Sequence, residues 1–252
     1  MNEIFSEITF FDNNAFIGKH LNPYTAPIFN LATLIDTMKI SGVSKSLIYH
    51  SASVSYDPSY GNKLLINETK DGKELSLVWV AVPEHCYTEN DTELFYAEMK
   101  RNNIAAIKIF PRYHNFTLIH GAMDNLLTLL DENEIPLLVN QEEISWEEIN
   151  YLLKNYKKIP FILQNVAYQM ERFVVPLFSK YNNIYIDISR YHVYNGVEYL
   201  CSRFGSERLL FGSGMPVFSP EPIMMMINNV KISLREKQNI SSENLLRLLH
   251  DK

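Results

Sequence analysis

The segment ITFFDNNAFIG, residues 8–18, joins an apolar run to polar residues in a pattern typical of an extended chain. It predicts a first β-strand that runs into a loop. Side chains of a strand alternate in direction, so the even positions are expected to share one face: Ile8, Phe10, Asp12, Asn14 and Phe16. We expect that face to point into a barrel, with Asn14 and Phe16 near its mouth.

The rest of the chain repeats one pattern, a short β-branched run followed by a helical stretch. Further strands are expected at Lys45–His50, Leu75–Val82, Ile104–Phe110, Pro136–Asn140, Pro160–Asn165, Ile184–Ser189 and Arg208–Ser213. A doubly wound open sheet would also alternate strands with helices. However, eight successive units with short connections favour closure of the sheet. We therefore predict a single (β/α)8 TIM barrel that covers residues 1–252 as one domain.

Two strands predict which side chains enter the barrel. In Ile104–Phe110 the β-branched residues Ile107 and Ile109 are expected to face the outer helices, so Lys108 should point into the lumen. In Ile184–Ser189 the isoleucines are expected outside, and Tyr185, Asp187 and Ser189 inside. The lumen is therefore expected to hold a lysine and an aspartate.

Composition narrows the range of partners. The chain of 252 residues carries a net charge of −6, and no basic patch stands out, so nucleic acid and membrane surfaces are not expected partners. Cys86 and Cys201 show no metal-type spacing and are expected to be thiols in a reducing compartment. The acidic N-terminus does not resemble a signal peptide, so we expect a cytoplasmic protein. A small molecule is the expected partner, and a homodimer stays open.

Several motifs together resemble one family. The first segment resembles an opening Asp-x-His-x-His-x-Gly, and GSERLLFGSGMP, residues 205–216, closely resembles Gly-x-Glu-Arg-x-x-x-Gly-Ser-Asp-x-Pro. AAIKIFP, IPLLVN, NNIYIDIS and the closing KQNISSENLLRLL add weaker matches along the whole chain. These motifs are similar to those of the amidohydrolase-related branch of the amidohydrolase superfamily. The resemblance implies a TIM barrel and a metal-dependent hydrolase or decarboxylase ancestor.

The chain departs from that family at the positions of its metal ligands. The family's two histidines on the first strand, its histidines ending strands five and six, and its aspartate after strand eight are replaced by Asn14, Phe16, Asn140, Asn165 and Gly214. An amide is a poor zinc ligand, and phenyl and glycine side chains offer no donor atom. We therefore expect no catalytic metal and no cofactor.

Other residues remain for catalysis. Lys108 and Asp187 either form an activated acid–base pair or simply neutralise each other as a buried ion pair. His114 follows the fourth strand and is a candidate base. Several histidines fall just beyond expected strand ends and could instead form a relocated metal site: His20, His50, His85, His114 and His192. The catalytic candidates are thus Asp187, His114 and Lys108.

Polar side chains at the strand ends could hold a ligand. Arg112 and Arg190 follow strands four and seven, and either could bind a carboxylate, although each could equally pair with a loop acid. The expected substrate-binding set is Asn14, Arg112, Asn140, Asn165, Ser189, Arg190 and Ser213. Three of the five replaced ligand positions are asparagine, which keeps hydrogen-bonding capacity at the mouth.

Three functions remain open from the sequence. The leading hypothesis is a divergent amidohydrolase-related protein that binds a small, carboxylated molecule and catalyses metal-independent hydrolysis or isomerisation. The second is a pseudoenzyme, a non-catalytic binding or scaffold protein. The third is a metal-dependent hydrolase with a relocated histidine site. Whether the chain is an enzyme therefore stays undecided, and an active form would be hydrolase-like.

Overall fold

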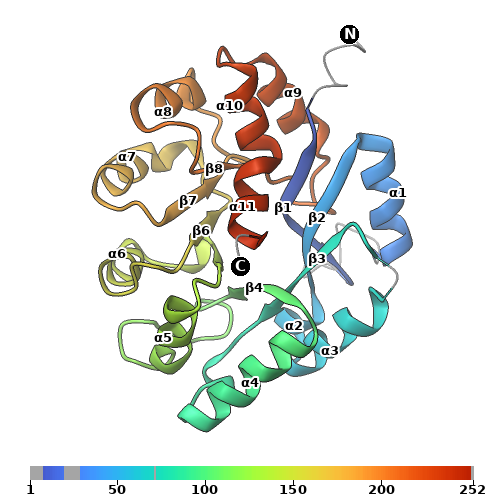
Figure 1. Cartoon of the computed structure of the whole chain (residues 1–252), viewed down its shortest axis with the longest axis vertical. Helices are drawn as coiled ribbons and strands as arrows, with labels where there is room; N and C mark the ends of the chain where they lie inside the picture. Colours follow the sequence, from blue (N-terminus) through green and yellow to red (C-terminus); the bar gives the residue numbers. More distant parts are fainter. Residues whose placement is uncertain (1–7, 20–28, 71, 251–252) are drawn as a thin grey trace.

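The computed structural model describes residues 8–19, 29–70 and 72–250. Eight parallel strands follow one another around a single sheet in the order β1-β2-β3-β4-β5-β6-β7-β8 (Figure 1). The strands are β1 (Phe10–Ile17), β2 (Val43–His50), β3 (Leu75–Val80), β4 (Ile104–Ile109), β5 (Leu137–Asn140), β6 (Phe161–Gln164), β7 (Ile184–Asp187) and β8 (Leu209–Leu210). Each strand pairs with its neighbour in sequence, so the predicted (β/α)8 barrel is confirmed.

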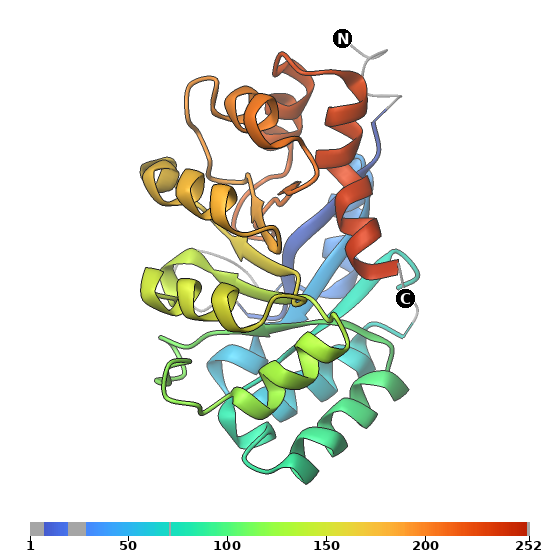
Figure 2. The same ribbon diagram turned by 60° about the vertical axis from the view of Figure 1, so that its left-hand side comes forward.

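Most helices surround the strands on the outside, and the C-terminal helix lies across one end of the barrel (Figures 1 and 2). They are α1 (Leu31–Ser41), α2 (Ala52–Ser55), α3 (Pro58–Glu68), α4 (Glu89–Arg101), α5 (Asp124–Glu132), α6 (Trp146–Asn155), α7 (Glu171–Lys180), α8 (Gly196–Phe204), α9 (Glu221–Asn229), α10 (Leu234–Gln238) and α11 (Asn244–His250). Side-chain caps begin several of them: Asn30 accepts from the Thr33 amide at 2.9 Å, and Ser145 and Glu148 form the capping box at the start of α6. No helix among the described residues is both long and apolar enough to cross a lipid bilayer.

Apolar side chains divide into two clusters, one on each side of the sheet. The outer cluster lies between strands and helices and contains Ile107, Ile109 and the β7 isoleucines. The lumen cluster fills the barrel and contains Ala106, Phe110 and one or two residues from each of most other strands. The predicted orientations of strands four and seven are confirmed, because their outward and inward residues separate between the two clusters.

The first strand departs from simple alternation. Phe10 packs in the outer cluster, against Phe211 at 5.1 Å between ring centroids, whereas Phe11 and Phe16 lie in the lumen cluster. The pairing of β1 with β2 shifts register twice, at Phe10/Phe11 and between Asp12 and Ala15. Such irregularities reverse the facing of the residues beyond them. The expectation that all even positions share one face was therefore wrong at Ile8 and Phe10, which both belong to the outer cluster.

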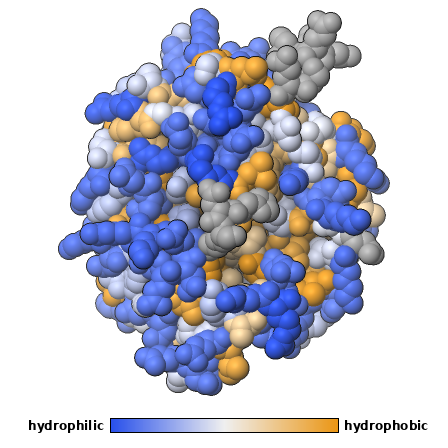
Figure 3. Space-filling view, viewed as in Figure 1, coloured by the Kyte–Doolittle hydropathy of each residue, from blue (hydrophilic) through white to orange (hydrophobic). Residues whose placement is uncertain are grey.

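The two ends of the barrel differ. At the end where the strands begin, Leu245 of α11 packs into the lumen cluster, with Leu248 and Leu249 beside it. The buried Asn244 fixes this helix by donating to the carbonyls of Ser206 and Leu209, at 2.7 and 2.9 Å. The face that carries α11 is hydrophilic over most of its area, with hydrophobic residues gathered near its centre (Figure 3). This end is plugged, and the opposite end forms the mouth.

The barrel closes through an irregular seam between β1 and the chain that follows β8. The backbone N–H of Asn13 donates to the Phe211 carbonyl at 3.1 Å, and the backbone N–H of Gly214 donates to the backbone carbonyl of Asn14 at 2.9 Å. Phe16 N–H donates to the Met215 carbonyl at 3.1 Å. We define the seam as these three backbone bonds together with the side-chain bonds of residues 12–14 described below.

Candidate functional site

A cavity of about 290 Å³ opens at the mouth of the barrel. Fourteen residues from most of the strand ends line it: Asn14, Phe16, Tyr49, Ser51, Val54, Phe110, Asn140, Glu142, Glu143, Asn165, Arg190, Gly214, Val217 and Phe218. The carboxyl ends of barrel strands are where catalytic and binding residues of this architecture gather. The volume suits a small ligand, since it lies at the low end of the range for small-molecule sites.

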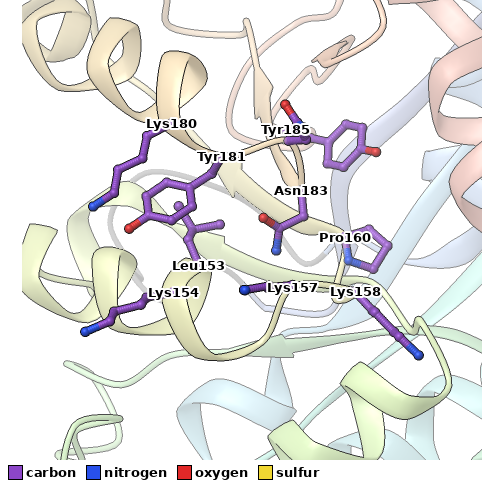
Figure 4. A pocket seen from close by; sticks show the side chains of 10 residues that line it. Leu153, Lys154, Lys157, Lys158, Pro160, Lys180, Tyr181, Asn183 and Tyr185 are labelled. Carbon is purple, nitrogen blue, oxygen red and sulfur yellow. The ribbon is translucent and has the colours of Figure 1, made fainter.

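A larger groove, of about 780 Å³, lies at the other end of the barrel (Figure 4). It is bounded by the segments that lead into β6 and β7, and four lysines surround it: Lys154, Lys157, Lys158 and Lys180. Lys180 is held by Asn150 at 3.4 Å and lies over the Tyr181 ring. None of the predicted site residues lines this groove, so the mouth cavity is the better candidate site.

Asn14 links three strands at the inner end of the mouth cavity. Its Nδ2 donates to Asn165 Oδ1 at 3.0 Å and to Asp187 Oδ2 at 3.1 Å. Ser189 donates to the other oxygen of Asp187, through its backbone N–H at 2.8 Å and through its hydroxyl. The structure therefore brings four of the predicted residues together in one hydrogen-bonded group across β1, β6 and β7.

Asp12 and Ser213 form a similar pair at the seam. The Ser213 N–H donates to Asp12 Oδ1 at 2.8 Å, and its hydroxyl donates to Oδ2. The backbone N–H of Asn14 adds a third bond to Oδ1, at 2.9 Å. Ser213 is thus committed to the carboxylate and lies outside the cavity lining, so its predicted role in substrate binding stays a prediction.

Both buried aspartates have raised pKa values. Burial raises the pKa of Asp12 to about 6, against the opposing effect of the bonds from Ser213 and Asn14. Burial also raises the pKa of Asp187, and the bonds from Ser189 and Asn14 oppose that effect. A carboxyl group that has lost its water favours the neutral form unless hydrogen bonds stabilise the charge. Each group can therefore hold a proton at higher pH than an exposed aspartate.

Lys108 lies inside the lumen, as predicted, and its side chain is only 1% exposed. Its Nζ is 4.6 Å from the ring centroid of Tyr49 and 5.2 Å from that of Phe110. Burial lowers its pKa to about 7, although the Asp187 carboxylate acts in the opposite direction. Among the described residues no ion pair joins Lys108 to Asp187, so the two charges are not in contact.

The remaining predicted residues fall into two groups. Asn140 lines the cavity with a buried Oδ1 that has no hydrogen-bond partner, and Arg190 lines it at 3.8 Å from Glu142. Arg112 instead lines a neighbouring shallow cavity. His114 bonds through Nε2 to the Val54 carbonyl at 3.0 Å and is not part of the mouth lining. Arg112 and His114 thus belong neither to the cavity lining nor to the hydrogen-bonded group around Asp187.

Sequence reasoning missed several residues of the site. Gln164 is fully buried and donates to the backbone and side-chain oxygens of Asn13, at 2.7 and 2.9 Å. Glu142 and Glu143 follow β5 directly and place carboxylates on the cavity wall. Their position two and three residues after the end of β5 was a signal in the sequence. Tyr49, at the end of β2, was also visible as an aromatic strand end.

The histidines do not assemble in the part of the chain that the structure describes. His50 Nδ1 accepts from the Ala52 N–H at 3.0 Å, and His85 Nε2 bonds to the Ser59 hydroxyl at 2.9 Å. His20 lies outside the described residues. Across residues 8–19, 29–70 and 72–250, no three His, Cys, Asp or Glu side chains are grouped closely enough to hold a metal ion.

Comparison with solved structures shows the same fold. A 5-carboxyvanillate decarboxylase from Novosphingobium aromaticivorans, solved with bound manganese, superposes with a TM-score of 0.75 at 9% identity, over 96% of this chain and 97% of that one. A 2,6-dihydroxybenzoate decarboxylase from Rhizobium gives 0.73 at 10% identity, over 96% and 98%. A candidate amidohydrolase from Staphylococcus aureus gives 0.74 at 13% identity, over 96% and 99%.

These neighbours confirm the resemblance to amidohydrolase-superfamily barrels at the level of the fold. No protein-family model and no curated protein matches the sequence. Identities of 9–13% establish the fold and leave the chemistry to be argued from the residues themselves.

Proposed function

We propose that this barrel binds a small carboxylated molecule in the mouth cavity and acts on it, by hydrolysis or isomerisation, without a catalytic metal. The solved neighbours include decarboxylases whose ligands are aromatic carboxylates, which supports a carboxylated ligand. In this chain Arg190 supplies a cation at the cavity wall, and the unpaired Oδ1 of Asn140 calls for a hydrogen-bond donor on the ligand.

One observation carries the metal-free part of the proposal. Asn14 and Asn165 stand at positions where the family that this chain resembles has metal-binding histidines. Here the side-chain amide of Asn14 donates to both Asp187 and Asn165. An N–H donor and a cation compete for the same oxygen lone pairs, so a metal ion there would have to displace this amide. Phe16 and Gly214, on the same cavity wall, provide no side-chain donor atom. The residues present therefore do not fit a catalytic metal.

The chemistry that remains is proton transfer within the barrel. Burial raises the pKa values of Asp187 and Asp12 and lowers that of Lys108, so the barrel holds carboxyl groups that keep a proton, and an amine that loses one, more readily than their exposed counterparts. Asp187 accepts a bond from the side chain of Asn14, a residue that lines the cavity, so a proton on Asp187 lies one side chain away from a bound ligand. We assign it the role of proton carrier for hydrolysis or isomerisation.

A non-catalytic binding protein is the second candidate, and one feature favours it. Asp187 is fully buried and both its oxygens already accept hydrogen bonds. A carboxylate held this way is a poor base unless the ligand displaces one of its donors. In that case the cavity would bind its ligand without turnover.

The test combines metal analysis with ligand binding and turnover. The purified protein is analysed for zinc and manganese, then screened by thermal shift and calorimetry against benzoates, oxo acids, lactones and esters. We expect substoichiometric metal, and carboxylate binding that a chelator leaves unchanged. Near-stoichiometric metal that a chelator removes together with binding would refute the proposal. Turnover that is lost in Asp187→Asn, with binding retained, would separate an enzyme from a binding protein.

A further inference from the structure

Lys108 is a buried amine without a polar partner. Among the described residues its Nζ takes part in no hydrogen bond and no ion pair. The Nζ lies over the Tyr49 and Phe110 rings, at 4.6 and 5.2 Å from their centroids. Fully buried lysines are almost always paired, because burial removes the water around the ammonium group and an unpaired group gains no interaction that replaces it. This lysine therefore needs an explanation.

Lys108 also lies next to the mouth cavity. Tyr49 and Phe110, which contact its Nζ, both line that cavity, and their ring centroids are 5.6 Å apart. Nearby carboxylates oppose the lowering of its pKa. Among them, Glu142 and Glu143 line the mouth cavity, and Asp187 bonds to the cavity residue Asn14. The amine thus sits beneath an aromatic cavity floor, where a ligand that parts or tilts the two rings would reach it.

Two roles for such an amine can be distinguished. A structural cation held over aromatic rings requires the charged form. A nucleophile requires the neutral form, whose nitrogen lone pair is free to attack. The apolar surroundings and the lack of a bonded anion favour the neutral form, and the lowered pKa of Lys108 agrees with this.

We propose that Lys108 Nζ is a nucleophile that forms an imine with the carbonyl group of a small 2-oxo acid bound in the mouth cavity. The inference rests on the proposed function for the cavity and for the ligand carboxylate. It adds the substrate class, an oxo acid, and a covalent step. Arg190 at the cavity wall would hold the carboxylate while the carbonyl faces the floor.

The step balances without any added reagent. The amine lone pair attacks the carbonyl carbon, and the carbon–oxygen π electrons move to oxygen, which takes up a proton. Nitrogen passes one of its two protons to the same oxygen, the carbon–oxygen bond breaks, and the oxygen leaves as water with both protons, so that the amine, the carbonyl and one proton give a protonated imine and one water. Asp187, the carboxylate that acts most strongly on Lys108, is suited to carry the proton. The imine then acidifies the adjacent C–H bond, which permits isomerisation through an enamine.

Reductive trapping tests the proposal on the wild-type protein. The protein is incubated at pH 7 with pyruvate, glyoxylate or 2-oxobutanoate and sodium cyanoborohydride, and each lysine adduct is quantified by peptide mass spectrometry. At pH 7 about half of an amine with pKa 7 is neutral, against roughly one in 2,500 for an exposed lysine, so labelling on the order of 10-fold faster is expected even with restricted access. Its rate should rise with pH through a midpoint near 7.

Lys45 provides the matched comparison. It also belongs to a barrel strand and lies over an aromatic ring, Phe11 at 6.0 Å, but it is exposed. Lys108→Met should abolish the fast adduct, whereas Lys45→Met should leave it unchanged. Acetone, which has the carbonyl but no carboxylate, should label Lys108 several-fold more slowly than pyruvate.

The outcomes separate this inference from the proposed function. If none of the three oxo acids labels Lys108 faster than Lys45, although carboxylates still bind in the cavity, the imine is refuted and the proposed function stands. If carboxylates do not bind and Lys108 is not labelled, both fail. Fast labelling of Lys108 that acetone reproduces at the same rate would overturn the assignment to an oxo acid.

Discussion

The amide of Asn14 and the carboxylate of Asp187 are joined across the barrel mouth by a hydrogen bond of 3.1 Å from Nδ2 to Oδ2. The bond ties β1 to β7, two strands that are not neighbours in the sheet. A carboxylate in place of the amide would set two acids against each other within the same buried space. The relationship can therefore be tested through stability.

Asn14→Asp should destabilise the protein increasingly as pH rises. Two carboxylates at hydrogen-bond distance repel each other when both are ionised. The loss in free energy of unfolding should therefore grow from pH 4.5 to pH 8. Asn14→Ala is the control, because it removes the donor without adding charge, and should cost about 1–3 kcal/mol at both pH values. Urea unfolding at the two pH values measures this. Equal losses for both variants at pH 8 would show that repulsion between the two carboxylates is not the source of the effect.

Asp12→Asn should stabilise the protein above pH 6. The pKa of Asp12 is raised from 3.8 to about 6 in the folded state, so its contribution to stability is present below pH 3.8 and is lost as pH rises through 6. The variant mimics the protonated group and escapes that loss, which amounts to about 3 kcal/mol for a shift of this size. Asp36→Asn, on the exposed face of α1, is the control. An advantage for Asp12→Asn that did not grow with pH would contradict the prediction.

Lys108→Met should show the opposite dependence on pH. The pKa of Lys108 is lowered from 10.5 to about 7, so its contribution is present above pH 10.5 and is lost as pH falls through 7. The variant should be more stable than wild type by up to about 5 kcal/mol at pH 6, with the gap narrowing towards pH 10. Guanidinium unfolding across this range measures it, with Lys45→Met as the control. A constant difference would mean that packing, and not charge, explains the effect.

Arg190→Met should weaken the binding of a carboxylated ligand, whereas Arg112→Met should not. Both arginines follow strand ends, but Arg190 lines the mouth cavity and Arg112 lies beside a separate one. Loss of a charge-assisted bond should reduce affinity by about tenfold or more, since such bonds contribute about 1.5–3 kcal/mol. Calorimetry with the best carboxylate from the binding screen measures it. Equal effects of the two substitutions would place the ligand outside the cavity.

The sequence predicted the strands and most strand orientations, because alternation and β-branched runs are local signals. Lys108 and Asp187 were expected in the lumen and lie there. Phe10 was misplaced because two register shifts in β1 are not visible in alternation alone. These irregularities depend on the partner strand and on the seam, which are long-range features.

The site was harder to predict than the fold. Asn14, Asn165 and Ser189 converge on Asp187, as their strand-end positions suggested. Arg112 and His114 occupy similar positions in sequence but point elsewhere, because the loop after β4 packs His114 against Val54 and Phe110. Side-chain direction in loops is set by such contacts, which sequence spacing does not encode.

The seam has a consequence for observing the mouth. Among the described strands, neighbours in sequence pair by ladders, whereas β1 meets the chain after β8 through separate bonds at Asn13, Phe16 and Gly214. Backbone bonds that lie outside a continuous ladder open locally more readily than bonds within one. Amide hydrogens at the seam should thus exchange with solvent faster than those in β4 or β5. A ligand lodged against Asn14 and Gly214 would slow that exchange, so hydrogen–deuterium exchange would report occupancy even for a ligand that undergoes no reaction.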